Sequence, residues 1–115
     1  MSGEKREKPR QRTYLGGQVV LDDGVTVSCL IRNLSATGAM IELPTPATLP
    51  DSWILIDMQN ARAYCVAVSW RRDMRMGLRL ERAFDLTGDV PDYLRHIQRL
   101  WSSQRQIRGD GNLRS

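Results

Sequence analysis

Residues 15–31 read LGGQVVLDDGVTVSCLI, two apolar runs on either side of Asp22-Asp23-Gly24. Both runs contain β-branched residues, which favour strands. An Asp-Gly pair between two such runs is a strong hairpin signal. We therefore predict two antiparallel strands over residues 15–21 and 25–31.

The length of the hairpin loop sets which side chains share a face of this sheet. In a three-residue loop with Gly24 in the left-handed conformation, Leu21 opposes Val25. This register suits a half-buried sheet better than a two-residue loop does. It places on one face Leu15, Gly17, Val19, Leu21, Val25, Val27, Cys29 and Ile31, and on the other face Gly16, Gln18, Val20, Thr26, Ser28 and Leu30.

Four further strand patterns follow the hairpin, at residues 38–43, 53–58, 62–71 and 76–80. Prolines at positions 44, 46 and 50 break the chain into a loop over residues 44–52. Six short strands joined mostly by hairpins predict an all-β fold, a closed six-stranded antiparallel barrel. The alternation predicts that Ala39, Ile41 and Leu43 point inward, that Tyr64, Val66, Val68 and Trp70 share a face, and that Met76, Leu78 and Leu80 share another.

The last third of the chain has a helical pattern. Residues 87–91 suit a helix entry because Pro91 is tolerated in a first turn. We expect the helix to pack on the barrel, although a partner or a second copy is an alternative occupant. Its apolar stripe consists of Val90, Tyr93, Leu94, Ile97, Leu100 and Trp101.

The predicted organisation has four parts: a basic arm (1–13), a barrel (14–82), a linker with a C-terminal amphipathic helix (83–108) and a disordered tail (109–115). Gly109 and Gly111 are expected to end the helix. At 115 residues, the chain is large enough for one modest core.

A formal net charge of +4 favours anionic partners. No apolar run is long enough to span a bilayer, and no signal peptide opens the sequence, so we expect a cytoplasmic protein. Cys29 and Cys65 lack the CxxC spacing of a redox or metal site. They are expected to be small buried side chains, with a disulfide as the alternative.

Two polar motifs carry the functional signal. Arg6 and Arg10 stand four apart in the basic arm, and Asn33-Leu34-Ser35-Ala36-Thr37-Gly38 forms a turn-like cluster between two strand patterns. The hairpin register puts Asn33 opposite Thr13, or opposite Tyr14 with the shorter loop. Arg10 then lies about three residues, roughly 10 Å, from the second motif. Guanidinium forks, an amide and a hydroxyl together suit a ligand with phosphates and purine edges.

This pairing resembles the PilZ domain family of cyclic di-GMP receptors, whose pattern is RxxxR followed by [DN]xSxxG. Arg6, Arg10, Asn33, Ser35 and Gly38 match that pattern. Residues 68–70 and 76–80 look like the closing strands of the family, and the resemblance covers residues 5–82.

The resemblance implies a receptor module that binds cyclic di-GMP, changes conformation and signals to a protein partner in motility, exopolysaccharide synthesis or transcription. Arg6 and Arg10 would clamp phosphates and lie along guanine faces, and Asn33 would address a guanine edge. Ser35 would bind phosphate or hold the turn. Gly38 would allow close approach to the ligand or a positive φ. By charge alone, Lys5 and Arg12 are possible helpers.

Two other functions fit parts of the sequence. The basic arm also suits a small barrel that binds nucleic acid, although no RNA-binding or zinc-finger motif accompanies it. A family member that binds only protein is the other alternative, but the five matching residues argue against it. Since no nucleophile pairs with a base and no cluster of metal ligands is present, we expect no catalysis, metal or cofactor.

Overall fold

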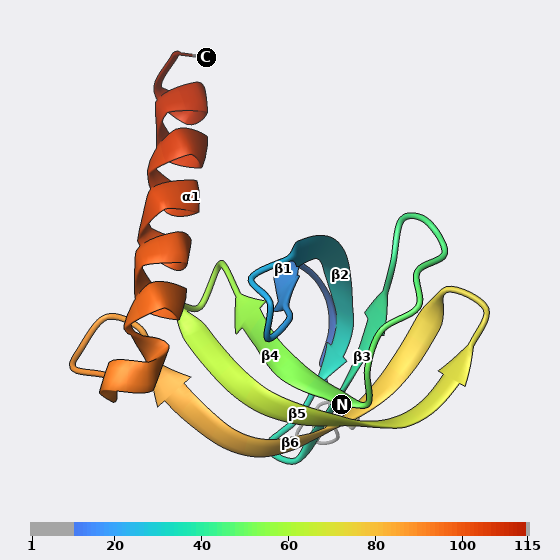
Figure 1. The fold of residues 1–115 in the computed structure, drawn as a ribbon. Coiled ribbons are helices and arrows are strands. Elements are labelled where there is room, and N and C mark those ends of the chain that lie inside the picture. The colour runs from blue at the N-terminus through green and yellow to red at the C-terminus, as the bar shows by residue number, and fades with distance from the viewer. Residues whose placement is uncertain (1–10, 115) are drawn as a thin grey trace, which may run out of the picture.

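The computed structural model describes the backbone of residues 11–114 and the side chains of residues 15–104. Six antiparallel strands close into a barrel in the order β1-β2-β3-β6-β5-β4, with a helix after the last strand (Figure 1). The predicted all-β barrel with a C-terminal helix is therefore confirmed. The elements are β1 (Gln11–Val20), β2 (Thr26–Leu34), β3 (Gly38–Glu42), β4 (Ser52–Asp57), β5 (Arg62–Arg72), β6 (Arg75–Asp85), the 3-10 turn η2 (Asp92–Leu94) and α1 (Arg95–Arg114).

The β1–β2 hairpin has the predicted three-residue loop. Val20 pairs with Thr26, and the Leu21 N–H donates to the Val25 carbonyl at 2.9 Å. Gly24 has a φ of 90°, a left-handed conformation that glycine adopts without steric cost. The Asp23 carboxylate accepts a hydrogen bond from the Val25 N–H at 3.0 Å, which fixes the turn.

The start of β1 departs from the predicted register. Asn33 pairs with Arg12, and neither Thr13 nor Tyr14 lies opposite it, because the register shifts between Arg12 and Leu15. Here β1 has one residue more than β2, as in a β-bulge. The strand also begins at Gln11 rather than at residue 15, because β2 continues to Leu34 and provides ladder partners for residues 11 and 12.

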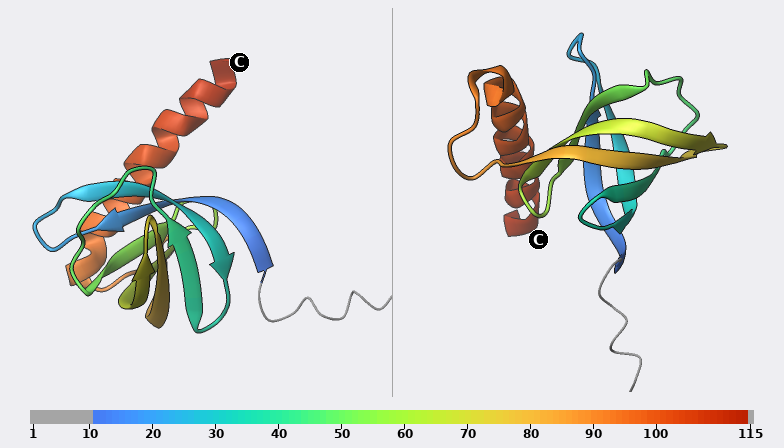
Figure 2. Two further views of the ribbon diagram at one scale, coloured as in Figure 1. Left: turned by 90° about the vertical axis from the view of Figure 1, so that its right-hand side faces the viewer. Right: turned by 90° about the horizontal axis from the view of Figure 1, so that it is seen from below.

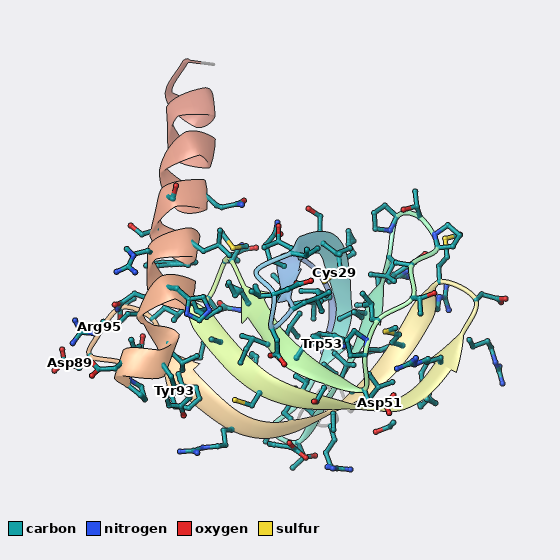
Figure 3. All side chains as sticks on the ribbon, in the orientation of Figure 1. Cys29, Asp51, Trp53, Asp89, Tyr93 and Arg95 are labelled. Atoms are coloured by element: carbon teal, nitrogen blue, oxygen red, sulfur yellow. The ribbon has the colours of Figure 1, made fainter. Side chains whose placement is uncertain are left out.

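Inward-facing apolar side chains fill the barrel. Ala39, Ile41 and Leu43 are buried as predicted, and Leu49 from the proline-rich loop also contributes to the core. Figure 3 shows Trp53 inside the barrel, where its indole N–H donates to the Pro50 carbonyl at 3.1 Å. The buried members of this core are Val19, Cys29, Ile31, Ala39, Ile41, Leu43, Leu49, Trp53, Leu55, Val66, Met76 and Leu78.

A second core lies outside the barrel, under the helix. Val20 and Ile56 belong to the outer face of the sheet, yet both are buried because α1 covers them. Trp101 is 9% exposed, and its indole N–H donates to the Met58 carbonyl at 3.2 Å. The apolar stripe of the helix therefore packs on the protein's own barrel, as expected, rather than on a partner.

Tyr93 is the exception within the predicted stripe. Its side chain is 54% exposed and makes an edge-to-face contact with Phe84, with 6.3 Å between ring centroids. Figure 3 shows Tyr93 and Arg95 at the start of the helix. Tyr93 lies in the 3-10 turn that precedes α1, where the helical period assumed from the sequence does not hold.

The C-terminal boundary also differs from the prediction. Instead of ending at residue 108, α1 continues through Gly109 and Gly111 to Arg114. Glycine weakens a helix by about 1 kcal/mol relative to alanine but does not block its hydrogen bonds, as proline does. Figures 1 and 2 show this part of the helix extending past the barrel.

Both cysteines are free thiols, so the alternative of a disulfide between them is wrong. Burial raises the pKa of the Cys29 thiol to about 12, which keeps it neutral. Cys65 is only half-buried. Among the helices of the described chain, none combines the length and the apolar character needed to cross a membrane.

Candidate functional site

The turn between β2 and β3 is organised by the Ser35 side chain. Its hydroxyl accepts hydrogen bonds from the backbone N–H groups of Thr37 and Gly38, at 3.4 and 3.1 Å, and donates to the Gly38 carbonyl at 3.2 Å. The Ser35 N–H donates to the same carbonyl at 2.9 Å. These bonds occupy the backbone N–H groups of Ser35, Thr37 and Gly38, so the Ser35 side chain holds the turn.

Gly38 lies where β3 approaches β6 closely. A Cβ atom at this position would lie 3.3 Å from the Leu78 carbonyl oxygen, closer than most such contacts. Of the glycines in residues 11–114, only Gly24 has a positive φ, so the suggested positive φ at Gly38 is wrong. Close packing of two strands therefore accounts for glycine at this position.

Asn33 lies between the two neighbouring strands, opposite Arg12 of β1 and Met40 of β3. It is half-buried and lines a cavity beside the turn. Within the described part of the chain, no hydrogen bond engages its side-chain amide. The amide is therefore available to a ligand in that cavity.

The cavity has a volume of about 370 Å³ and lies between the β2–β3 turn and the β5–β6 pair. This volume falls within the range of small-molecule sites. None of the described residues that line it is acidic, which suits an anionic ligand. They are Asn33, Ser35, Thr37, Gly38, Ala39, Met40, Ser69, Trp70, Gly77 and Leu78.

Trp70 forms one wall of the cavity. The prediction that its side chain shares a face of the strand with Tyr64, Val66 and Val68 is wrong. These three residues alternate along β5, but the register shifts between Val68 and Trp70. Trp70 consequently pairs with Gly77 on the outer face, since Met76 and Leu78 point inward. The one-residue shift thus turns a large aromatic side chain, 47% exposed, toward the cavity.

Gly77 makes room for this ring. A Cβ atom on Gly77 would lie 2.0 Å from the Trp70 Nε1 atom, so any other residue would displace the indole. No hydrogen bond of the Trp70 indole is found among the described residues. A glycine directly opposite an aromatic residue could have suggested this packing, but only after the register was known.

Arg79 is a cation that the strand register places beside the turn. It pairs with Gly38 across β3 and β6, and its guanidinium donates to the Glu81 carboxylate at 2.7 Å. Because this ion pair is exposed, it contributes little to stability, so Arg79 can exchange Glu81 for another anion at small cost.

Arg6, Arg10 and Lys5 lie outside the described residues, and the side chain of Arg12 is also undescribed. The backbone still restricts where the two arginines can lie. Gln11 pairs with Leu34, so the Cα atom of residue 10 is one peptide unit, about 3.8 Å, from a residue beside the turn. Position 6 is four residues further, at most about 14 Å. Covalent geometry therefore keeps position 10 next to the strand pair that leads into the β2–β3 turn, and the roles of the two arginines stay predictions.

Comparison with known families decides what kind of domain this is. The sequence model of the PilZ domain matches residues 4–100, which includes both arginines, the β2–β3 turn and the start of α1. The chain belongs to the PilZ domain family. Comparison with curated proteins finds no match.

PilZ domains in general are modules that bind cyclic di-GMP, and they are a ligand-binding rather than a catalytic family. The resemblance inferred from the two motifs is therefore confirmed at the level of the family. In this PilZ domain, the β2–β3 turn, Asn33 and the Trp70 wall lie around one cavity.

Proposed function

We propose that this PilZ domain binds cyclic di-GMP in the cavity beside the β2–β3 turn and reports the binding to a protein partner. The observation that carries the proposal is the position of this cavity. It is lined by Asn33 and Ser35 and lies at the end of β1 from which Arg10 departs. An amide, a hydroxyl and an arginine beside one cavity suit a dianionic ligand with two guanine bases.

Each site residue has a distinct role in this proposal. Arg6 and Arg10 bind phosphates with guanidinium forks and stack on guanine, which lysine does less well. Asn33 uses its amide to bind a guanine edge. Ser35 fixes the turn through its three hydrogen bonds, so it acts mainly by positioning the residues around it. Lys5 and Arg12 add positive charge.

Cyclic di-GMP should bind with far higher affinity than cyclic di-AMP. Guanine offers two acceptors to an arginine fork, whereas adenine has an amino group in place of one of them. We expect calorimetry to show saturable heat with cyclic di-GMP and little with cyclic di-AMP or GTP at the same concentrations. The titration also gives the number of ligands per chain.

Comparable affinity for the two cyclic dinucleotides would contradict the proposed guanine recognition. Titration of a generic oligonucleotide at several salt concentrations provides a further control. Strong binding that falls steeply with salt would instead indicate a nucleic-acid-binding barrel.

Trp70→Ala should weaken binding of cyclic di-GMP because the indole wall provides a stacking surface. A stacked base is worth about 1–3 kcal/mol by alanine substitution, roughly five- to a hundredfold in affinity. We expect Trp70→Phe to keep most of the affinity, and Tyr93→Ala, which removes another exposed aromatic ring, to change nothing. Equal affinity of Trp70→Ala and the parent protein would show that Trp70 does not contact the ligand.

Binding should also protect the basic arm from amide exchange. Residues 2–10 contain no large apolar side chain, so the arm has little to bury without a ligand. Cyclic di-GMP held at the turn would attract Arg6 and Arg10 and draw the arm over itself. The surface made of arm, ligand and barrel is what the partner would recognise.

Hydrogen exchange measured by mass spectrometry on residues 3–10, with and without cyclic di-GMP, tests this switch. We expect fast exchange without ligand and slower exchange at saturation. Exchange that is already slow without ligand would contradict the switch and indicate a preformed site. An unchanged rate at saturating ligand would also contradict it.

A further inference from the structure

The cavity beside the β2–β3 turn has no charged side chain among the described residues that line it. The N–H groups of Ser35, Thr37 and Gly38 are engaged within the turn, so they do not neutralise a phosphate there. A dianionic ligand therefore needs cations from outside the lining. Arg10 directly precedes β1, which lies on the far side of β2 from β3 and β6. A cation on the β6 side of the cavity would complement it.

Arg79 of β6 lies on that side of the cavity. The register between β3 and β6 pairs Arg79 with Gly38, which lines the cavity. The next residue, Leu80, donates its N–H to the Thr37 carbonyl at 2.9 Å, so this part of β6 is bonded to the turn itself. The backbone thus fixes Arg79 beside the turn.

The Arg79 side chain points to the outer face of the barrel, the face that also carries Trp70. Leu78 is buried in the core, and successive side chains of a strand alternate, so Arg79 faces outward. Its cross-strand partners are Gly38 and Ala67, and neither has a side chain long enough to reach over the sheet. The Gly38 backbone is roughly 5 Å away across the ladder, within the length of an arginine side chain. The guanidinium can therefore pass over Gly38 into the cavity.

In the structure, the Glu81 carboxylate holds this guanidinium. The Arg79 Nη2 atom donates to the Glu81 Oε2 atom at 2.7 Å. Glu81 lies two residues further along β6, on the side of Arg79 away from Gly77 and the cavity. The two side chains are 61% and 44% exposed, so water and salt weaken their attraction. Another anion can displace Glu81 from such a pair.

A structural role explains the Arg79–Glu81 pair poorly. Both residues belong to β6, so the pair joins no separate elements of the fold. The ion pair of Arg71 and Asp51 is different, because it connects β5 to the end of the proline-rich loop at 2.8 Å. The position of Arg79 beside an uncharged cavity suggests a role in binding instead.

We propose that Arg79 binds a phosphate of the ligand, and that Glu81 competes with the ligand for the same guanidinium. This inference rests on the proposed function, because it adds a residue to the proposed cyclic di-GMP site. A carboxylate and a phosphate both offer two oxygen atoms to the planar fork of arginine, so binding replaces one charge-assisted pair with another. The internal pair must break before the ligand binds Arg79, and it therefore lowers the affinity.

Calorimetric titration of the full chain with cyclic di-GMP at fixed salt tests the contact. We expect Arg79→Ala to bind about tenfold more weakly than the parent protein. Arg82→Ala is the matched control, because it removes the same charge from the same strand. The Arg82 guanidinium lies over the Phe84 ring, 5.4 Å from its centroid. The affinity of this control should stay within about twofold of the parent.

Glu81→Gln tests the competition. Glutamine forms no ion pair with Arg79, so the affinity should rise about two- to fivefold. Asp73→Asn measures the general effect of losing a negative charge, and asparagine tolerates the positive φ of 55° at this position. In a protein that already carries Arg79→Ala, Glu81→Gln should add no more than Asp73→Asn does. A merely structural pair would not show this dependence on Arg79.

Arg79→Lys distinguishes a phosphate contact from a base contact. Lysine binds phosphate as a point charge but lacks the planar fork that matches a guanine edge. We expect Arg79→Lys to keep its affinity within about threefold of the parent. A loss as large as that of Arg79→Ala would overturn the assignment to phosphate.

The same titrations separate this inference from the proposed function. If the parent protein does not bind cyclic di-GMP, the proposed function is wrong, and the role of Arg79 is wrong with it. If the parent binds and Arg79→Ala binds equally well, only the role of Arg79 is wrong. An equal gain from Glu81→Gln with and without Arg79, or an equal gain from Asp73→Asn, would overturn the competition.

Discussion

Arg10→Ala and Arg6→Ala should each lower the affinity for cyclic di-GMP by roughly ten- to a hundredfold. Each substitution removes charge-assisted hydrogen bonds to a phosphate, worth about 1.5–3 kcal/mol. Arg10 directly precedes Gln11, which pairs with Leu34 beside the turn. Isothermal titration calorimetry at fixed salt measures the loss.

Two controls separate specific contacts from a general effect of charge. Arg99→Ala lowers the net charge equally, but Arg99 is an exposed residue of α1 outside the lining of the cavity, so its affinity should match the parent. Arg6→Lys keeps the charge and loses the planar fork, so it should still weaken binding. If both alanine variants bind like the parent, the arm does not hold the ligand.

Trp101→Ala should lower the free energy of unfolding by about 3–5 kcal/mol, the range for truncation of a buried aromatic residue. Trp101 is 9% exposed in the core under α1 and packs with Ile97, Leu94 and the outer face of the sheet. The substitution also leaves the Met58 carbonyl without its indole donor. Urea unfolding followed by circular dichroism measures the change.

Trp101→Phe and His96→Ala are the controls for this prediction. Phenylalanine refills part of the volume but cannot donate a hydrogen bond, so the loss should be smaller than with alanine. His96 is exposed on the same helix, and its replacement should change stability little. A loss below about 1 kcal/mol for Trp101→Ala would mean that the helix contributes little to the fold.

Local features of the fold could be predicted from the sequence because they depend on neighbours along the chain. The Asp22-Asp23-Gly24 turn predicted the hairpin and the pairing of Leu21 with Val25, and both are confirmed. The alternation of Ala39, Ile41 and Leu43 predicted their burial. The helical spacing of Leu94, Ile97 and Trp101 predicted a stripe that packs on the barrel.

The candidate site could be predicted only in part. Asn33, Ser35 and Gly38 form a motif around the β2–β3 turn whose residue types identify it without a structure, and the family match includes them. The sequence did not reveal that Trp70 belongs to the cavity, or that Ser35 already bonds the turn N–H groups. Both depend on how separate strands lie against one another.

The sequence by itself determined the hairpin loop, the strand order along the chain and most of the apolar stripe of the helix, and it contains the two polar motifs that the family match includes. Only the tertiary structure decided that Trp70 faces outward, that Asn33 lies opposite Arg12 and that Val20 is buried. The reason is the two-residue period of a strand. One extra residue in a ladder reverses every side chain beyond it. The two-residue period of a strand also cannot show which part of the outer surface of the barrel a distant helix will cover.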